Sequence, residues 1–438
     1  MARQLGVTSC YRDKLKKFSQ IRKPSSRLAP NFCKDHFFIM IEPKSSVPAA
    51  WPGPCLATRM AAVAPFLAMD VLSAAKTKER AGDSVIHMEI GEPTAAAPRL
   101  AREAAQAALA IGRIGYTEAL GLPSLRAAIA SHYRRLYGLS LAPERIAVTT
   151  GSSGGFVLAF LALFEPGARV AIASPGYPAY RNTLLALGLE PVPVPANAAS
   201  GWVIEAAALR RIHGEAPLSG VLTMSPGNPT GTVMGRETLQ AVGQTCRELG
   251  LWFISDEIYH GLTYEAPAET ALAFDDDAII VNSFSKYFCM TGWRIGWLVM
   301  PERIVRPIER LAQNLFISPP YLSQVAAEAA FGAAEELEMI KAGYAANRAL
   351  LLNELPALGL DRLAPADGAF YVYADVSRFT NDSLDFCRRL LADTGVAATP
   401  GLDFDQDEGH RYLRLSFAGS EADCRGTVER LRNWLPHI

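Results

Sequence analysis

The sequence lacks the patterns that mark metal centres, disulfide frameworks and hydrolytic triads. Its seven cysteines are dispersed, and neither they nor the seven histidines follow a metal-binding spacing such as Cys-x-x-Cys. An odd, scattered set of cysteines is typical of reduced thiols in a cytosolic compartment. No Ser/His/Asp pattern accompanies a nucleophile elbow, so a hydrolase has no support. We therefore expect a cytoplasmic protein without a bound metal.

Long apolar runs and an excess of one charge are also missing. The longest apolar stretch, residues 154–164, is too short for a bilayer, which needs about 20 residues, and we expect no membrane segment. The 43 lysines and arginines against 44 acidic residues give a formal net charge of -1. This balance favours neither nucleic acid nor an anionic membrane as a partner. With 438 residues, half of them hydrophobic, the chain can form two or three domains that act on a small molecule.

Residues 1–59 differ from the rest in composition. They contain eleven lysines and arginines, three acidic residues and six prolines, with only one short apolar run at residues 37–41. We interpret this leader as mostly disordered. Its prolines oppose the amphipathic helix of an organellar transit peptide, although a targeting role stays open. Translation starting at Met60 is an equally good interpretation, in which case the leader is not native protein.

From about residue 105 to 300, short apolar or β-branched runs alternate with helix-length amphipathic segments such as residues 237–249. This alternation predicts an α/β fold with a mostly parallel sheet covered by helices on both faces. In such sheets, ligands bind beyond the carboxyl ends of the strands. The predicted strands are residues 146–150, 170–174, 221–225, 251–256, 278–283 and 296–300.

The C-terminal part predicts a second, smaller α+β domain. A long helical stretch at residues 325–355 is followed by strand-like segments at 370–374 and 412–417. We expect residues 105–324 to form the large domain, and residues 60–104 with 325–438 to form the small one.

Two strand ends carry residues suited to catalysis. The strand at residues 251–255 runs into Asp256-Glu257-Ile258-Tyr259, which places a carboxylate and a phenol at the carboxyl edge of the sheet. Thirty residues later, another strand delivers Ser283-Phe284-Ser285-Lys286, and Arg294 follows. A lone acidic turn or a lone lysine would be unremarkable, but their combination indicates a site.

These motifs resemble those of the class I pyridoxal-phosphate aminotransferases, the family with the aspartate aminotransferase fold. The signatures Ser-Pro-Gly-Asn-Pro-Thr-Gly, Ser-Asp-Glu-Ile-Tyr, Ser-Phe-Ser-Lys and Tyr-Leu-Arg-Leu-Ser-Phe occur in the family's order, at residues 225–231, 255–259, 283–286 and 412–417. The resemblance covers about residues 85–438. It implies an enzyme that moves an amino group from an amino acid to a 2-oxo acid with pyridoxal 5'-phosphate as cofactor.

The resemblance implies roles for four residues at the ring of the cofactor. Lys286 would form the Schiff base and then act as the base that moves the α proton. Asp256 would pair with the pyridine nitrogen and keep it protonated, so that the ring accepts the electrons of the carbanion. Tyr259 and Asn228 would donate hydrogen bonds to the phenolic oxygen. Asn228 also fits a turn role in Pro-Gly-Asn-Pro, and both roles can hold together.

The cofactor phosphate needs hydrogen-bond donors. The turn at residues 150–155, Thr-Gly-Ser-Ser-Gly-Gly, lies between a strand and an apolar helical stretch, where free N–H groups and the helix dipole favour an anion. It lacks the G-x-G-x-x-G and P-loop patterns, so a dinucleotide or ATP is poorly supported. We expect Ser152 and Ser153 to bind the phosphate, and the resemblance adds Ser283 and Arg294.

Three further residues complete the predicted site. Arg414 lies between Leu413 and Leu415 on a predicted strand, where an unpaired guanidinium would be costly, so it needs an anion. The resemblance implies that Arg414 binds the α-carboxylate of the substrate beside the backbone N–H of Gly91, whereas an internal salt bridge is the alternative. It also implies that Tyr177 stacks on the pyridine ring, unless that side chain is simply a core residue.

The family also implies a homodimer in which Tyr116 reaches the cofactor phosphate of the neighbouring subunit; a local helix-capping role is the alternative. Ser153 occupies the position where some members specific for acidic substrates carry a lysine, which weakens a dicarboxylate preference. A lyase or synthase on the same scaffold would share all these motifs. A transcription regulator with an aminotransferase-like domain would need an N-terminal DNA-binding unit, for which the leader is too short and too rich in proline.

Overall fold

The computed structural model describes residues 56–438, and the fold described here is that of Ala57–Ile438. The predicted leader therefore lies, up to Cys55, outside the described residues. The helices are α1 Leu67–Arg80, α2 Arg99–Ala110, α3 Pro123–Tyr137, α4 Gly151–Leu163, α5 Pro178–Ala186, α6 Ala206–Glu215, α7 Arg236–Leu249, α8 Glu302–Leu315, α9 Tyr321–Ala330, α10 Ala334–Glu354, α11 Ser383–Thr394 and α12 Glu421–Trp434.

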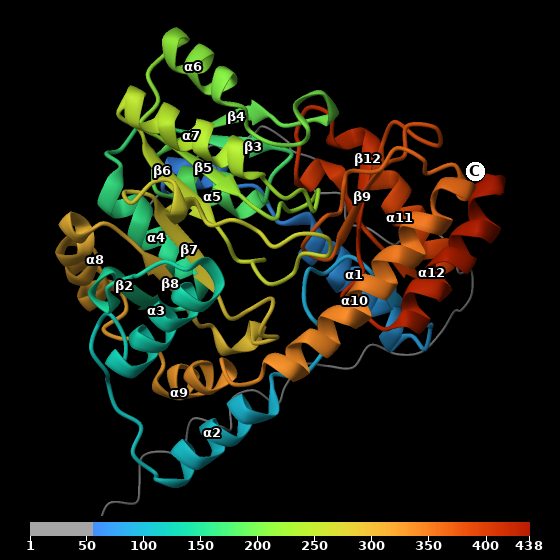
Figure 1. The fold of residues 1–438 in the computed structure, drawn as a ribbon. Helices are drawn as coiled ribbons and strands as arrows, with labels where there is room; N and C mark the ends of the chain where they lie inside the picture. The colour runs from blue at the N-terminus through green and yellow to red at the C-terminus, as the bar shows by residue number, and fades with distance from the viewer. Residues whose placement is uncertain (1–55) are drawn as a thin grey trace, which may run out of the picture. The chain divides into compact units, whose positions relative to one another are not determined.

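Seven strands form the central sheet in the order β2-β8-β7-β6-β5-β3-β4 (Figure 1). The pairings among β3 to β7 are parallel, whereas β8 runs antiparallel to both of its neighbours. The prediction of a mostly parallel sheet is therefore confirmed. The bounds are β2 Ile146–Thr149, β3 Arg169–Ser174, β4 Glu190–Pro195, β5 Gly220–Met224, β6 Trp252–Asp256, β7 Ile279–Ser283 and β8 Gly296–Val299.

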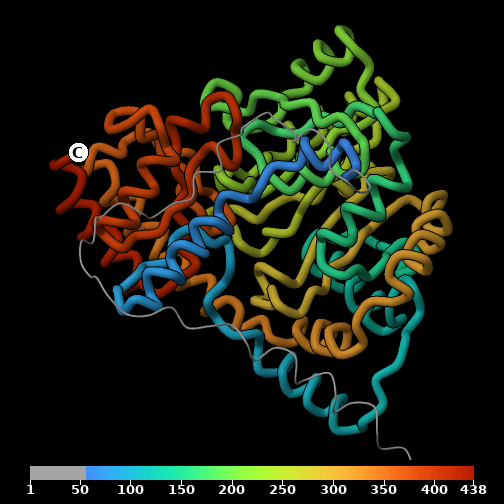
Figure 2. The backbone as a smooth tube through the Cα atoms, turned by 180° about the vertical axis from the view of Figure 1, so that it is seen from behind, coloured from blue at the N-terminus to red at the C-terminus, as the bar shows by residue number. Residues whose placement is uncertain are grey.

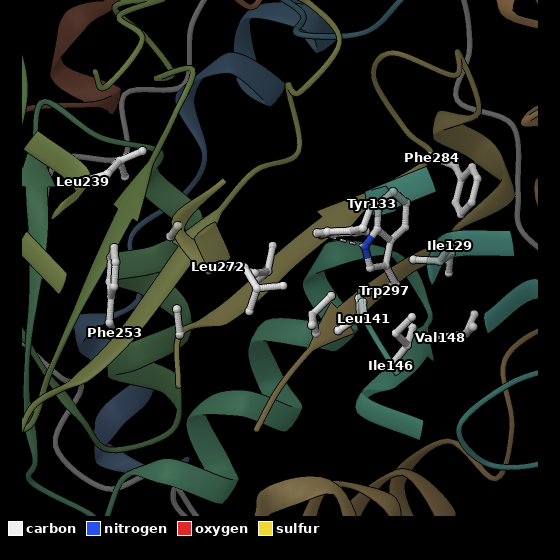
Figure 3. Packing of buried hydrophobic residues seen from close by; sticks show 14 of the residues in the cluster. Ile129, Tyr133, Leu141, Ile146, Val148, Leu239, Phe253, Leu272, Phe284 and Trp297 are labelled. Atoms are coloured by element: carbon white, nitrogen blue, oxygen red, sulfur yellow. Dashed lines mark hydrogen bonds between the residues drawn. The ribbon is translucent and has the colours of Figure 1, made fainter. Parts of the chain in front are cut away.

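Helices cover both faces of this sheet because its strands are apolar on both sides. In β7, Ile280 belongs to the buried cluster that includes residues of α3, α6 and α7, whereas Ile279 and Val281 belong to the cluster that includes residues of α4, α5 and α8. Figure 3 shows part of the first cluster, in which the indole Nε1 of Trp297 donates a hydrogen bond of 3.3 Å to the Tyr133 hydroxyl. Burial on two sides explains the continuous apolar runs in the sequence.

The smaller α+β domain contains an antiparallel sheet in the order β11-β12-β9, with α10, α11 and α12 packed around it. Beside this sheet, β1 pairs in parallel with β10. The bounds are β1 Ile86–His87, β9 Tyr371–Asp375, β10 Val396–Ala397, β11 Thr399–Pro400 and β12 Tyr412–Ser416. The residues that precede α1 contact α5, and α1 itself contacts β10 and β11, so this part of the chain crosses from the large sheet to the C-terminal elements (Figure 2). The predicted domain boundaries stay predictions.

Two sequence predictions need correction. Strand β4 was missed because Pro191, Pro193 and Pro195 make it unlike a strand; it lies at the sheet edge, where proline costs no ladder hydrogen bond. The predicted helix at residues 325–355 is two helices, since α9 ends at Ala330 and α10 begins at Ala334, with Gly332 in the break. Among residues 56–438, no helix is long and apolar enough to cross a membrane.

Candidate active site

Lys286 follows β7 at the carboxyl edge of the sheet, as the sequence predicted. Its Nζ donates a hydrogen bond of 2.6 Å to the carbonyl oxygen of Gly91 and lies 5.9 Å from the ring centre of Tyr259. Burial lowers the pKa of Lys286 to about 8, and the positive charges of Arg414 and Arg294 act in the same direction. An amine with such a pKa is partly neutral near physiological pH and can act as a nucleophile or a base.

Asp256 ends β6 and is buried at the same edge. The hydroxyl of Tyr180 donates to its Oδ2, and the backbone N–H of Ile258 donates to its Oδ1 at 3.0 Å. Burial raises the pKa of Asp256 to about 6, although these donors and Lys286 oppose the shift. Sequence reasoning missed Tyr180; its position three residues after Tyr177, which caps the N-terminus of α5, was the available signal.

The hydroxyl groups of Tyr259 and Tyr371 lie 2.6 Å apart in a buried pair. Burial raises the pKa of Tyr259 well above its ordinary value. Gly91 is packed against this pair, because a Cβ atom there would lie 2.0 Å from the Tyr371 hydroxyl oxygen. The structure thus brings Tyr259, Gly91 and Lys286 together. Tyr371 was missed because it follows an ordinary strand-like pattern.

The predicted phosphate ligands converge at the start of α4. At Gly151, where φ is +71°, a Cβ atom would lie 2.5 Å from Nη2 of Arg294, so glycine lets the guanidinium approach the helix N-terminus. Ser283 is buried, donates to the carbonyl of Ile295 at 2.9 Å and lies 2.8 Å from the Ser285 hydroxyl. Ser152 and Ser153 begin α4 and retain exposure. A guanidinium and free helical N–H groups form a site suited to an anion.

Arg414 lies on β12 with only 2% of its surface exposed. Its Nη1 donates to Asn228 Oδ1 at 2.9 Å, and its Nη2 donates to the carbonyl of Glu89 and, at 3.3 Å, to Thr399 Oγ1. All three acceptors are neutral, and its buried Nε has no acceptor among the described residues. No salt bridge of the described residues includes Arg414, although its charge and that of the buried Asp403 carboxylate interact.

Two N–H groups of the Arg414 guanidinium remain free, because the three hydrogen bonds use three of its five donors. They lie on Nε and Nη1, which do not share an edge of the guanidinium, so a carboxylate that binds through both oxygens would displace an acceptor of Nη2. The rings of Tyr371 and Phe404 lie 4.4 and 4.8 Å from the guanidinium carbon and confine it. The arrangement therefore favours a small carboxylate ligand.

The two remaining predicted tyrosines differ in their surroundings. Tyr177 packs edge to face on Tyr180 and Phe66, with ring centres 5.3 and 6.0 Å away, and burial raises its pKa to about 12. Tyr116 lies between α2 and α3 and is 82% exposed. Within one chain, the structure does not bring Tyr116 to the other predicted residues.

Residues 83–431 match the family described as aminotransferase class I and II. The chain belongs to this family. The resemblance read from its motifs is thus confirmed, and the protein is a transaminase that moves an amino group from an amino acid to a 2-oxo acid. The lyase, synthase and regulator alternatives gain no support.

Several relatives cover nearly the whole of the described chain. It is 50% identical to a valine–pyruvate aminotransferase of Mycobacterium tuberculosis over 86% of this chain and 97% of that protein. It is 34% identical to an aspartate/prephenate aminotransferase of Thermus thermophilus over 86% and 97%. A crystal structure of a Mycobacterium tuberculosis aminotransferase superposes with a TM-score of 0.86 at 49% identity, covering 88% of this chain and all of that one. The Thermus thermophilus aspartate aminotransferase with maleate gives 0.82 at 33% identity, over 87% and 100%.

Among residues 56–438, no group of three or more histidine, cysteine or acidic side chains is arranged to hold a metal ion. The four cysteines of this part are free and buried.

Proposed function

We propose that this transaminase uses pyridoxal 5'-phosphate and that Arg414 binds the α-carboxylate of its substrates. The observation that carries the proposal is the buried Arg414 guanidinium, whose described acceptors are all neutral. A buried cation without an anionic partner is costly, and an incoming carboxylate removes that cost. The backbone N–H of Gly91, two residues after the Glu89 carbonyl that accepts from Arg414, would be a second donor for this carboxylate.

The residues of the site fit the cofactor. Lys286 would hold its aldehyde carbon, the buried Asp256 carboxyl would hold its ring nitrogen, and Arg294 with Ser283, Ser152 and Ser153 would hold its phosphate at the start of α4. When bound, pyridoxal phosphate supplies an electron sink for the carbanion left by removal of the α proton.

The surrounding rings orient the cofactor and the substrate. Tyr177 would stack on the pyridine face, and Tyr259 and Asn228 would donate to the phenolic oxygen. Two further tyrosines would hold these groups in place: Tyr180 donates to Asp256, and Tyr371 pairs with Tyr259. The Lys286 Nζ, with its pKa lowered by burial, would accept the α proton of the amino donor and return it at the neighbouring carbon.

For the substrates, we propose a neutral amino acid such as valine as donor and pyruvate as acceptor. The support is the relative named valine–pyruvate aminotransferase at 50% identity, together with Ser153 at a position where a cation would favour a dicarboxylate. A donor and acceptor panel tests this proposal. We expect a higher kcat/KM for valine with pyruvate than for aspartate with 2-oxoglutarate, and the reverse order would refute it.

We further propose a homodimer, with Tyr116 completing the site of the partner subunit. Besides Tyr116, the exposed large apolar residues at the end of α2 and after it are Leu109, Ile111 and Ile114. Such a run of exposed apolar side chains is typical of a surface that is covered by another chain. The dispersed reduced cysteines support a cytoplasmic location for the enzyme.

A further inference from the structure

The segment from β1 to Gly91 contains a buried carboxylate that the proposed reaction does not use. The side chain of Glu89 is fully buried, and its Oε2 has no hydrogen-bond partner among the described residues. Its Oε1 lies 2.8 Å from Nδ1 of His87. A buried carboxylate is costly unless a cation neutralises it, so the partner of Glu89 determines whether this segment is stable.

His87 is placed to be that cation. Its Nδ1 faces Glu89 Oε1, and its Nε2 lies 3.1 Å from Oε1 of Glu79 on α1. A neutral imidazole carries one N–H, whereas two carboxylates as acceptors require an N–H on each nitrogen. The geometry therefore matches the imidazolium. Burial by itself lowers the pKa of His87, but hydrogen bonds and charges from Glu89 and Glu79 outweigh it and raise the pKa above its ordinary value.

The backbone of the same segment contacts both principal residues of the site. The carbonyl oxygen of Glu89 accepts from Arg414 Nη2 and, at 2.8 Å, from Thr399 Oγ1. Two residues later, the carbonyl oxygen of Gly91 accepts from Lys286 Nζ at 2.6 Å. A displacement of this short segment would thus move the acceptors of the carboxylate-binding guanidinium and of the lysine together.

We propose that His87 and Glu89 are positioning residues of this transaminase: the imidazolium of His87 neutralises the buried Glu89 and so fixes the carbonyl that orients Arg414. The inference rests on the proposed role of Arg414. Neither side chain touches the substrate. Loss of the proton from His87 leaves Glu89 as an unpaired buried charge and weakens binding of the substrate carboxylate.

The direction of the pH effect follows from the groups that face His87. Glu89 acts from the end of its own strand and Glu79 from α1, where Lys76 shares the Glu79 carboxylate at 2.9 Å. From α12, Arg430 donates to the backbone carbonyls of Ser84 and Thr394. Because the pKa of His87 is raised, the pair is intact at low pH and is lost as the pH rises through that value. KM for the amino donor therefore increases with pH.

A double-mutant cycle tests the coupling with valine as donor and pyruvate as acceptor. His87→Gln should raise KM on the order of tenfold, the effect of one charge-assisted hydrogen bond, while kcat changes less than about twofold. Glu89→Gln removes the buried charge, so the double variant His87→Gln with Glu89→Gln should return KM to within about threefold of the parent. It should also lose the increase of KM with pH. His410→Gln, far along the chain, is the matched control.

A second measurement needs no turnover. Nuclear magnetic resonance of the imidazole nitrogens in the holoenzyme should show His87 with both nitrogens protonated at neutral pH and a titration point that falls in Glu89→Gln. A titration point at or below the ordinary histidine value overturns the proposal, as does a double variant with a KM no lower than that of His87→Gln. If no donor and acceptor pair turns over, the proposed function fails while the resonance result still decides the state of His87. If His87→Gln does not fold, Glu89→Gln alone decides: an unchanged titration of His87 refutes the pairing.

Discussion

Replacement of Arg414 by lysine separates recognition of the substrate carboxylate from the rest of the chemistry. The change keeps a positive charge on β12 but removes the planar pair of donors. The guanidinium presents its N–H donors in a planar fork that matches both oxygens of a carboxylate, whereas the ammonium of lysine is a compact charge without this paired geometry. A charge-assisted hydrogen bond contributes about 1.5–3 kcal/mol, so kcat/KM should fall roughly 10- to 150-fold.

The assay compares two amino donors at one pH. With valine the fall should be of that size, whereas a carboxylate-free amine such as 2-aminobutane should react almost equally well with both enzymes. Arg411→Lys is the matched control. Arg411 lies directly before β12 and forms salt bridges with Glu408 and Asp375 near the surface. A kcat/KM for valine within twofold of the parent would refute the role of Arg414. An equal fall with 2-aminobutane would show that the variant disturbs the site as a whole.

Four further predictions address other parts of the protein. Lys286→Ala should abolish turnover yet still bind pyridoxal phosphate, and borohydride should no longer attach the cofactor covalently; covalent attachment would show that another amine reacts. Removal of residues 1–59 should leave activity and melting temperature within error, and a protein that fails to fold would contradict the leader hypothesis. Mixing Lys286→Ala/Arg294→Ala with Tyr116→Ala should restore activity in hybrid dimers, whereas a fully active monomer in sedimentation would exclude shared sites. In cofactor-free protein, burial raises the pKa of Asp256 to about 6, so stability should fall as the pH rises from about 4 to 6; Asp256→Asn should remove about 3 kcal/mol of that loss in pH-dependent unfolding, and parallel profiles would argue against a buried charge.

The sequence by itself determined the parts of the protein that depend on local pattern. Strands β2, β3 and β5 to β8 were predictable because burial on both faces requires continuous apolar runs. The carboxyl ends of neighbouring parallel strands meet at one edge, so Asp256 at the end of β6 and Lys286 after β7 could be placed at the same edge of the sheet from their order alone. The position of Arg414 between two apolar residues of a strand agrees with its burial in the structure, whereas its need for an anion stays a prediction.

Other features were decided only by tertiary structure. Strand β4 forms despite its prolines because β3 offers a paired edge. The antiparallel direction of β8 against β7 was likewise visible only in the folded chain. The partners of the site are far away in sequence: Tyr180 is 76 residues from Asp256, Tyr371 is 112 from Tyr259, and Arg414 is 325 from Glu89. No periodicity links such pairs, because they meet only when separate packed layers bring their backbones together. The pairing of His87 with Glu89 could not be predicted from the sequence for the same reason. Only the folded chain buries Glu89 and places His87 between two carboxylates.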